Sequence, residues 1–90
     1  MTFASLREVV ETPQFEQDRS VLMPNVERWD EIMRGVMWAI SRSPTIGTPI
    51  GSTGMYAIPT DEWKGAPALV IYYSFTNDQV TLHSVIRAAC

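Results

Sequence analysis

Residues 70–88 read VIYYSFTNDQVTLHSVIRA and predict a β-hairpin near the C-terminus. Two runs rich in β-branched and aromatic residues flank a short polar turn, which is the usual sequence pattern of two antiparallel strands. We expect the strands at residues 68–75 and 80–87, with Phe75 paired to Val80 across the turn. A lone hairpin is at best marginally stable in water, so further elements must cover its apolar side chains.

This register assigns every residue of the hairpin to one of two faces, because side chains alternate along a strand. The mostly apolar face, expected under the helices, carries Leu69, Ile71, Tyr73, Phe75, Val80, Leu82, Ser84 and Ile86. The opposite, open face carries Val70, Tyr72, Ser74, Thr81, His83, Val85 and Arg87. Tyr72 and His83 are then expected to be cross-strand neighbours.

The first half of the chain predicts two helices. Thr12 and Pro13 are typical of a helix start, because threonine caps free N–H groups and proline lacks the N–H that would be orphaned there. A short helix is therefore expected at residues 13–22. Residues 26–42 form the clearer helix, because apolar side chains recur at helical spacing. These are Trp29, Ile32, Met33, Val36, Met37 and Ile40.

Two further runs, at residues 3–11 and 55–59, have the composition of strands, and residues 43–54 are expected to be a loop rich in glycine and proline. The resulting order is strand, helix, helix, strand, strand, strand. This order predicts an α+β fold with two helices packed on one face of a small, mainly antiparallel sheet. The length of 90 residues predicts a single domain, residues 1–90.

Composition narrows the class of protein. The net charge of −3 argues against a dedicated nucleic-acid-binding domain, which is more often basic. Cys90 is the only cysteine, so the chain makes no internal disulfide and no zinc site is expected, as suits a reducing cytosol. No apolar run has the roughly 18 residues needed to cross a bilayer, and the N-terminus does not read as a signal peptide. We therefore expect a cytoplasmic protein without a membrane partner, a metal or another cofactor.

The open face carries the side chains that suggest chemistry. The phenol of Tyr72, the imidazole of His83 and the guanidinium of Arg87 are together suited to a phosphodiester. Imidazole exchanges protons near neutral pH, and guanidinium binds phosphate oxygens with two hydrogen bonds. The alternative is an ordinary solvated sheet face on which tyrosine and histidine only pack against each other.

Trp38 stands apart from the apolar stripe of its helix. It lies about 180° from Trp29 on the helical wheel, among polar residues that include Arg42. Tryptophan and arginine are over-represented at the energetic centres of protein interfaces, so Trp38 is a candidate contact for a partner. The alternative is that Trp38 packs on the first helix. Trp63, in the loop before the hairpin, is either a plug over the core or part of a binding rim.

Three segments carry a resemblance that covers nearly the whole chain. VVETPQFEQD, residues 9–18, is followed by VERWDEIMRGVMWAISRSP, residues 26–44, with the IGTPIG loop after it. LVIYYSFTNDQVTLHSV, residues 69–85, closes the chain. In their order, size and hairpin they resemble the RelE/ParE superfamily of bacterial type II toxins.

The resemblance implies that the open face of the sheet is the working surface. RelE-like members cut mRNA on the ribosome, ParE-like members poison DNA gyrase, and both are held inactive by a cognate antitoxin. RNA-cutting members usually carry an arginine on the third strand, where this sequence has Val70. Arg87 matches a C-terminal basic residue of the family, and Lys64 lies in a loop where other members have basic residues.

We therefore expect the toxin of a toxin–antitoxin pair that acts as a ribosome-dependent mRNA interferase, an endoribonuclease that inhibits translation. The expected catalytic residues are His83, Arg87 and Tyr72, the substrate-binding residues Lys64, Ser74 and Thr81, and the partner-binding residues Trp38, Arg42 and Trp63. One alternative is a non-enzymatic protein of the same fold, either a gyrase-type inhibitor or a degenerate toxin that only binds an antitoxin. Another is an unrelated α+β interaction domain. For the assembly of the protein, a monomer and a homodimer both stay open.

Overall fold

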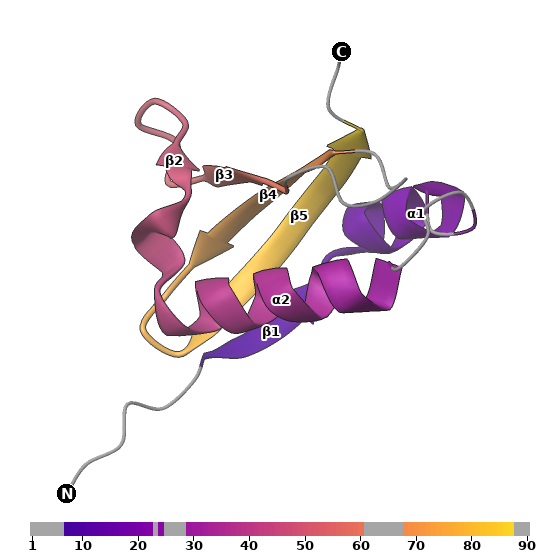
Figure 1. The fold of residues 1–90 in the computed structure, drawn as a ribbon. Helices are drawn as coiled ribbons and strands as arrows, with labels where there is room; N and C mark the ends of the chain where they lie inside the picture. Colours follow the sequence, from indigo (N-terminus) through magenta and orange to yellow (C-terminus); the bar gives the residue numbers. More distant parts are fainter. Residues whose placement is uncertain (1–6, 23, 25–28, 61–67, 88–90) are drawn as a thin grey trace, which may run out of the picture.

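The computed structural model describes residues 7–22, 24, 29–60 and 68–87. Two helices pack against a five-stranded sheet (Figure 1). In chain order the elements are β1 (Glu8–Glu11), α1 (Pro13–Leu22), α2 (Trp29–Arg42), the 3₁₀ helix η2 (Pro44–Ile46), β2 (Thr48–Pro49), β3 (Tyr56–Pro59), β4 (Leu69–Phe75) and β5 (Gln79–Arg87). Among the described helices, none is long and apolar enough to span a bilayer.

The sheet has the order β1-β5-β4-β3-β2. β1 runs parallel to β5, and the other neighbouring pairs are antiparallel. The expected α+β class and mainly antiparallel sheet are therefore confirmed. The expected loop at residues 43–54 is wrong in part, since it contains η2 and the two-residue edge strand β2. β2 contains Pro49, and proline is tolerated in a sheet at such an edge.

Thr12 turns the chain from β1 into α1. Its Oγ1 accepts a hydrogen bond from the N–H of Phe15 at 3.1 Å, which caps the helix as the sequence predicts. The same hydroxyl donates to the carbonyl of His83 at 3.1 Å, and the N–H of Thr12 donates to the carbonyl of Leu82 at 3.0 Å. The start of α1 is thereby tied to the middle of β5.

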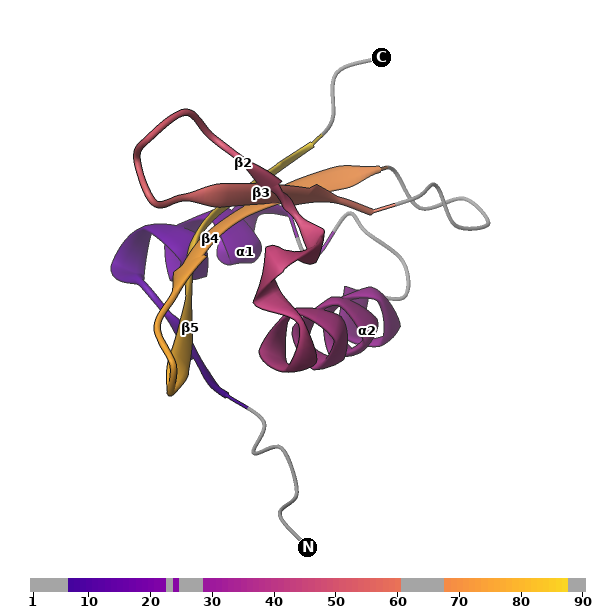
Figure 2. The same cartoon turned by 90° about the vertical axis from the view of Figure 1, so that its left-hand side faces the viewer.

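Both helices bury side chains in one hydrophobic core. α2 crosses the sheet, and Figure 2 shows it on one side of the curved strands β3, β4 and β5. α1 lies beside β5 in the direction of the C-terminal end of that strand (Figure 1). The buried apolar residues are Phe15 from α1, Trp29, Met33 and Ile40 from α2, and Leu69, Ile71, Tyr73, Val80, Leu82 and Val85 from the hairpin.

The hairpin has the expected register at its turn and a different one beyond it. Phe75 pairs with Val80, as predicted, but a bulge follows and Tyr72 pairs with Ser84. A bulge adds one residue to one strand, so every later side chain of β5 changes face. Val85 is 1% exposed and Ile86 is 44% exposed, the reverse of the expectation.

Candidate functional site

The open face of the hairpin holds a hydrogen-bonded serine–histidine pair. The Oγ of Ser74 lies 2.7 Å from Nε2 of His83, and both side chains are half-buried. Ser74 is in β4, opposite Thr81 in β5, and His83 is the extra residue of the bulge. The bond holds the Nε2 edge of the imidazole against Ser74. Imidazole is the side chain that most often serves as a general acid or base in enzymes.

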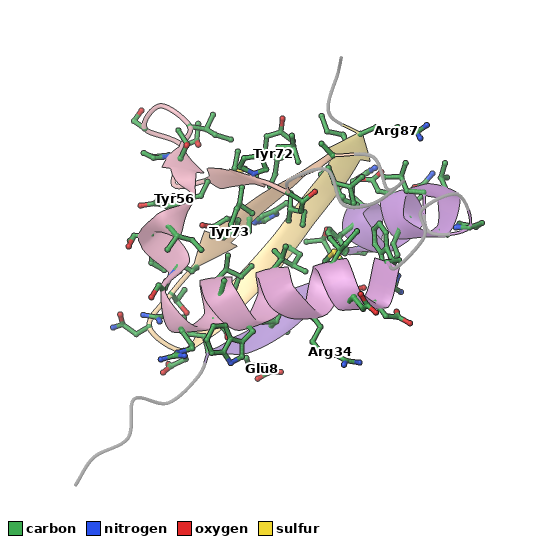
Figure 3. All side chains as sticks on the ribbon, viewed as in Figure 1. Glu8, Arg34, Tyr56, Tyr72, Tyr73 and Arg87 are labelled. Carbon is green, nitrogen blue, oxygen red and sulfur yellow. The ribbon has the colours of Figure 1, made fainter. Side chains whose placement is uncertain are left out.

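Tyr72 lies on the same face, beside the bulge. It pairs with Ser84 on β5 and with Ala57 on β3, so the expected direct pairing of Tyr72 with His83 is wrong. His83 and Ser84 together stand opposite Tyr72, so the backbone of His83 lies close to Tyr72 although the two residues do not pair. Figure 3 shows Tyr72 on the side of the sheet turned away from α2.

Arg87 does not share this face. It pairs with Leu69, whose side chain is fully buried, and it is exposed at the end of β5 (Figure 3). We expected Arg87 beside Tyr72 and His83, and the bulge is the physical reason for the difference. Arg87 is also the only lysine or arginine of β4 and β5, so no guanidinium from the hairpin lies beside the imidazole.

Val70 sits where the resemblance places an arginine. It pairs with Pro59 on β3 and with Ile86 on β5, and it is half-buried. This end of the open face is therefore apolar. Lys64 and Trp63, expected to contact substrate and partner, lie outside the described residues, and their roles stay predictions.

Asp18 of α1 fixes the strand immediately after the bulge. Its Oδ2 accepts hydrogen bonds from Ser84 Oγ at 2.7 Å and from the N–H of Val85 at 3.2 Å. Its Oδ1 accepts one from Gln14 Nε2 at 2.8 Å. Burial raises the pKa of Asp18, but these hydrogen bonds outweigh burial and lower the pKa below its usual 3.8. The sequence showed no sign of this carboxylate clamp, because it joins residues 66 positions apart.

Trp38 is exposed on the outer side of α2. Its side chain is 57% exposed, and the guanidinium carbon of Arg42 lies 4.4 Å from the ring centroid. This geometry is a cation–π contact. The alternative in which Trp38 packs on α1 is wrong, and the prediction that it lies off the core stripe is confirmed.

A cavity of about 360 Å³ opens between α1, α2 and β1. Its apolar lining comes from Phe15, Trp29, Met33 and Met37, and its polar lining from Glu11, Arg19, Asp30 and Arg34. Arg19 Nη1 and Glu11 Oε1 form an ion pair at 2.8 Å. Across the part of the chain that the structure describes, no three His, Cys, Asp or Glu side chains are grouped to hold a metal ion.

Comparison with known proteins gives structural matches only. No family model and no curated protein matches the sequence. A chain of the Escherichia coli DinJ–YafQ toxin–antitoxin complex matches with a TM-score of 0.52 at 13% identity, over 92% of this chain and 93% of that one. A mutant of E. coli YafQ matches with a TM-score of 0.52 at 12% identity, over 90% and 92% of the two chains. The chain has the RelE-like fold of YafQ.

The similarity to YafQ extends along most of the chain. The match spans about nine-tenths of both chains, so the two share their architecture along most of their length. The fold expected from the resemblance is thereby confirmed. At 12–13% identity the similarity extends to the fold and leaves the roles of individual side chains open.

Proposed function

We propose that this protein is the toxin of a type II toxin–antitoxin pair and is held inactive by a cognate antitoxin. The observation that carries the proposal is the RelE-like fold, shared along almost the full length of both chains with a toxin crystallised in a toxin–antitoxin complex. Fold alone does not specify chemistry, so the reaction has to be argued from the site.

The open face is proposed to cleave mRNA. His83 accepts the proton of a ribose 2′-hydroxyl as that oxygen attacks the adjacent phosphorus. The bond to the 5′-oxygen breaks, and the phenol of Tyr72 protonates this leaving oxygen. The products are a 2′,3′-cyclic phosphate and a 5′-hydroxyl. Ser74 holds His83 in place through the 2.7 Å bond, and Thr81, opposite Ser74, contacts the substrate.

The ribosome is proposed to supply what the face lacks. A phosphorane-like transition state gains charge, and losing one donor that stabilises such charge typically costs about 10²–10³ in rate. The hairpin places no guanidinium beside His83, and the whole chain carries a net charge of −3. Binding of free RNA would therefore be weak. Stabilisation by ribosomal groups would make cleavage depend on the ribosome.

A second function is favoured by Val70. The apolar end of the open face, with Val70, Pro59 and Ile86 in adjacent positions, suits contact with a protein better than contact with phosphate. In this alternative the protein keeps the fold but not the reaction. It acts as a gyrase-type inhibitor or as a degenerate toxin that only binds an antitoxin.

Primer extension on a reporter mRNA separates the two functions. The purified protein is incubated with the mRNA alone and with the mRNA in a translating extract. New 5′ ends that form only with ribosomes support the interferase. They should disappear with His83→Gln, which can still hydrogen-bond to Ser74. Intact mRNA in both reactions, together with inhibited DNA supercoiling by gyrase or no inhibition at all, would favour the binding function.

A further inference from the structure

The exposed side of α2 carries a stripe of two arginines around a tryptophan. Arg34, Trp38 and Arg42 follow at intervals of four residues, so their side chains lie one above another on the helix. Their Cα positions span about 12 Å. All three are exposed, and Figure 3 shows Arg34 pointing away from the sheet. We call these three residues the α2 stripe.

Trp38 is not needed for the core. Trp29, Met33 and Ile40 already fill the buried side of α2, and Trp38 is 57% exposed. An exposed tryptophan leaves a large apolar area in water, which a monomer gains nothing by keeping. Arg42 lies over the ring and holds it in one orientation, which reduces the entropy that a binding partner would have to remove.

The α2 stripe continues into the cavity between α1 and α2. Arg34 lines that cavity, and on the helical wheel it lies between Met37, which also lines it, and Trp38. Phe15, Trp29 and Met33 belong to the apolar half of the cavity lining, and charged side chains form the other half. An apolar side chain brought in by a partner therefore finds a recess next to the exposed tryptophan.

We propose that the α2 stripe and the adjoining cavity dock an acidic amphipathic helix of the partner protein. Two carboxylates about two helical turns apart would pair with Arg34 and Arg42. An apolar side chain between them would lie on Trp38, and another would enter the cavity. This is the helix-in-groove mode of recognition, with charge complementarity fixing the register. The proposal rests on the proposed function, because the partner it describes is the antitoxin.

The charges along α2 favour a peptide over RNA. Asp30 and Glu31 lie in the first turn of the helix, ahead of the α2 stripe, and would repel a strand that carries a phosphate at every step. A peptide can place its acidic residues only where the arginines are.

A synthetic peptide tests the docking surface without the natural antitoxin. The probe is a fluorescent helical peptide of about 18 residues, long enough to hold a helix in water. It carries two glutamates two turns apart with leucine between them, and a control peptide has glutamine in place of both glutamates. Binding is followed by fluorescence anisotropy to the full chain, at low and at high salt.

We expect the acidic peptide to bind more tightly than the control peptide and to lose that advantage at high salt. Trp38→Ala should weaken binding about tenfold or more. The double variant Arg34→Gln/Arg42→Gln should remove the preference for the acidic peptide, and it keeps the test readable if Trp38→Ala folds poorly. Arg87→Gln removes one positive charge at a distant strand end and Val21→Ala removes an exposed apolar group from α1, so both should bind like the wild type.

Equal binding of the two peptides would overturn the proposal. So would unchanged binding by both stripe variants, or a single-stranded RNA oligonucleotide that binds to the α2 stripe in place of the peptide. Selective peptide binding by a protein that does not arrest growth would keep the docking surface and reject the toxin assignment. Growth arrest by a protein that does not prefer the acidic peptide would keep the toxin assignment and reject the docking surface.

Discussion

Replacing Gly47 by alanine should destabilise the protein through Tyr73. A Cβ at this position would lie 2.5 Å from the Tyr73 hydroxyl and 3.0 Å from the carbonyl of Ala57. The φ of Gly47 is −73°, which any residue adopts, so space and not backbone conformation requires glycine here. Tyr73 is fully buried, so its ring has little room to move. Overpacking of this kind costs about 1–3 kcal/mol of unfolding free energy.

The Tyr73 hydroxyl also makes two hydrogen bonds to the backbone. It donates to the Pro44 carbonyl at 2.5 Å and accepts from the Gly47 N–H at 3.1 Å. Burial raises the pKa of Tyr73, so the phenol stays protonated and available as a donor. Tyr73→Phe leaves both backbone groups without this partner and should cost about 1–3 kcal/mol. Tyr73→Phe also removes the hydroxyl oxygen with which the Cβ of Gly47→Ala would clash.

A double-mutant cycle in urea tests the reasoning. Gly47→Ala should cost at least about 1 kcal/mol less in the Tyr73→Phe background than in the wild type, because the closest contact is gone. Gly35→Ala is the matched control: a Cβ there meets nothing within 4 Å, and glycine in an exposed helix costs about 1 kcal/mol relative to alanine. It should leave stability unchanged or raise it. Strictly additive costs, or a neutral Gly47→Ala, would refute the account of this contact.

Three further predictions concern the elements that hold the open face. Because the pKa of Asp18 is lowered on folding, its carboxylate should stabilise the protein above about pH 4, and this contribution should vanish as the pH falls through the lowered pKa. In Asp18→Asn, the free energy of unfolding measured with urea should therefore depend less on pH in the acid range than in the wild type. An unchanged pH dependence would contradict the stabilising role of the Asp18 hydrogen bonds. Phe15→Ala should lower stability by about 3–5 kcal/mol, because the ring is fully buried between α1 and the hairpin, and a thermal melt displaced by only a degree or two would disprove that packing. Arg19→Gln should cost less than about 1 kcal/mol in the same melt, since its ion pair with Glu11 is partly exposed; a larger loss would mean that the pair is structurally essential.

Local sequence patterns predicted most of the helices and strands. Thr12 and Pro13 fixed the start of α1, the apolar spacing marked α2, and the Phe75–Val80 pairing was correct. The bulge at His83 was not predicted, because the register at Phe75 and Val80 was extended along β5 by strict alternation of side chains. Tertiary contacts accompany it: Thr12 bonds to the carbonyls of Leu82 and His83, and Asp18 accepts hydrogen bonds from the two residues that follow His83. The misplacement of Ser84, Val85, Ile86 and Arg87 follows from that single extra residue.

The candidate site was predicted in part. Tyr72, Ser74, Thr81 and His83 share the open face as expected, and the serine–histidine bond gives the histidine a fixed position. Arg87 belongs elsewhere because strand phase after a bulge depends on contacts far away in sequence. Helical spacing in the sequence shows which residues share one side of α2, as those of the α2 stripe do. It does not show which residues of other elements face them, so the cavity between α1 and α2 could not be predicted from it.

Growth after induced expression of this chain alone, compared with His83→Gln at equal protein level, tests the central claim most directly. Val21→Ala, an exposed apolar change away from the open face, is the control. The account predicts growth arrest with the wild type and with Val21→Ala, and relief with His83→Gln at an unchanged melting temperature. Equal arrest by wild type and His83→Gln would contradict it, because the open face would then have no part in toxicity.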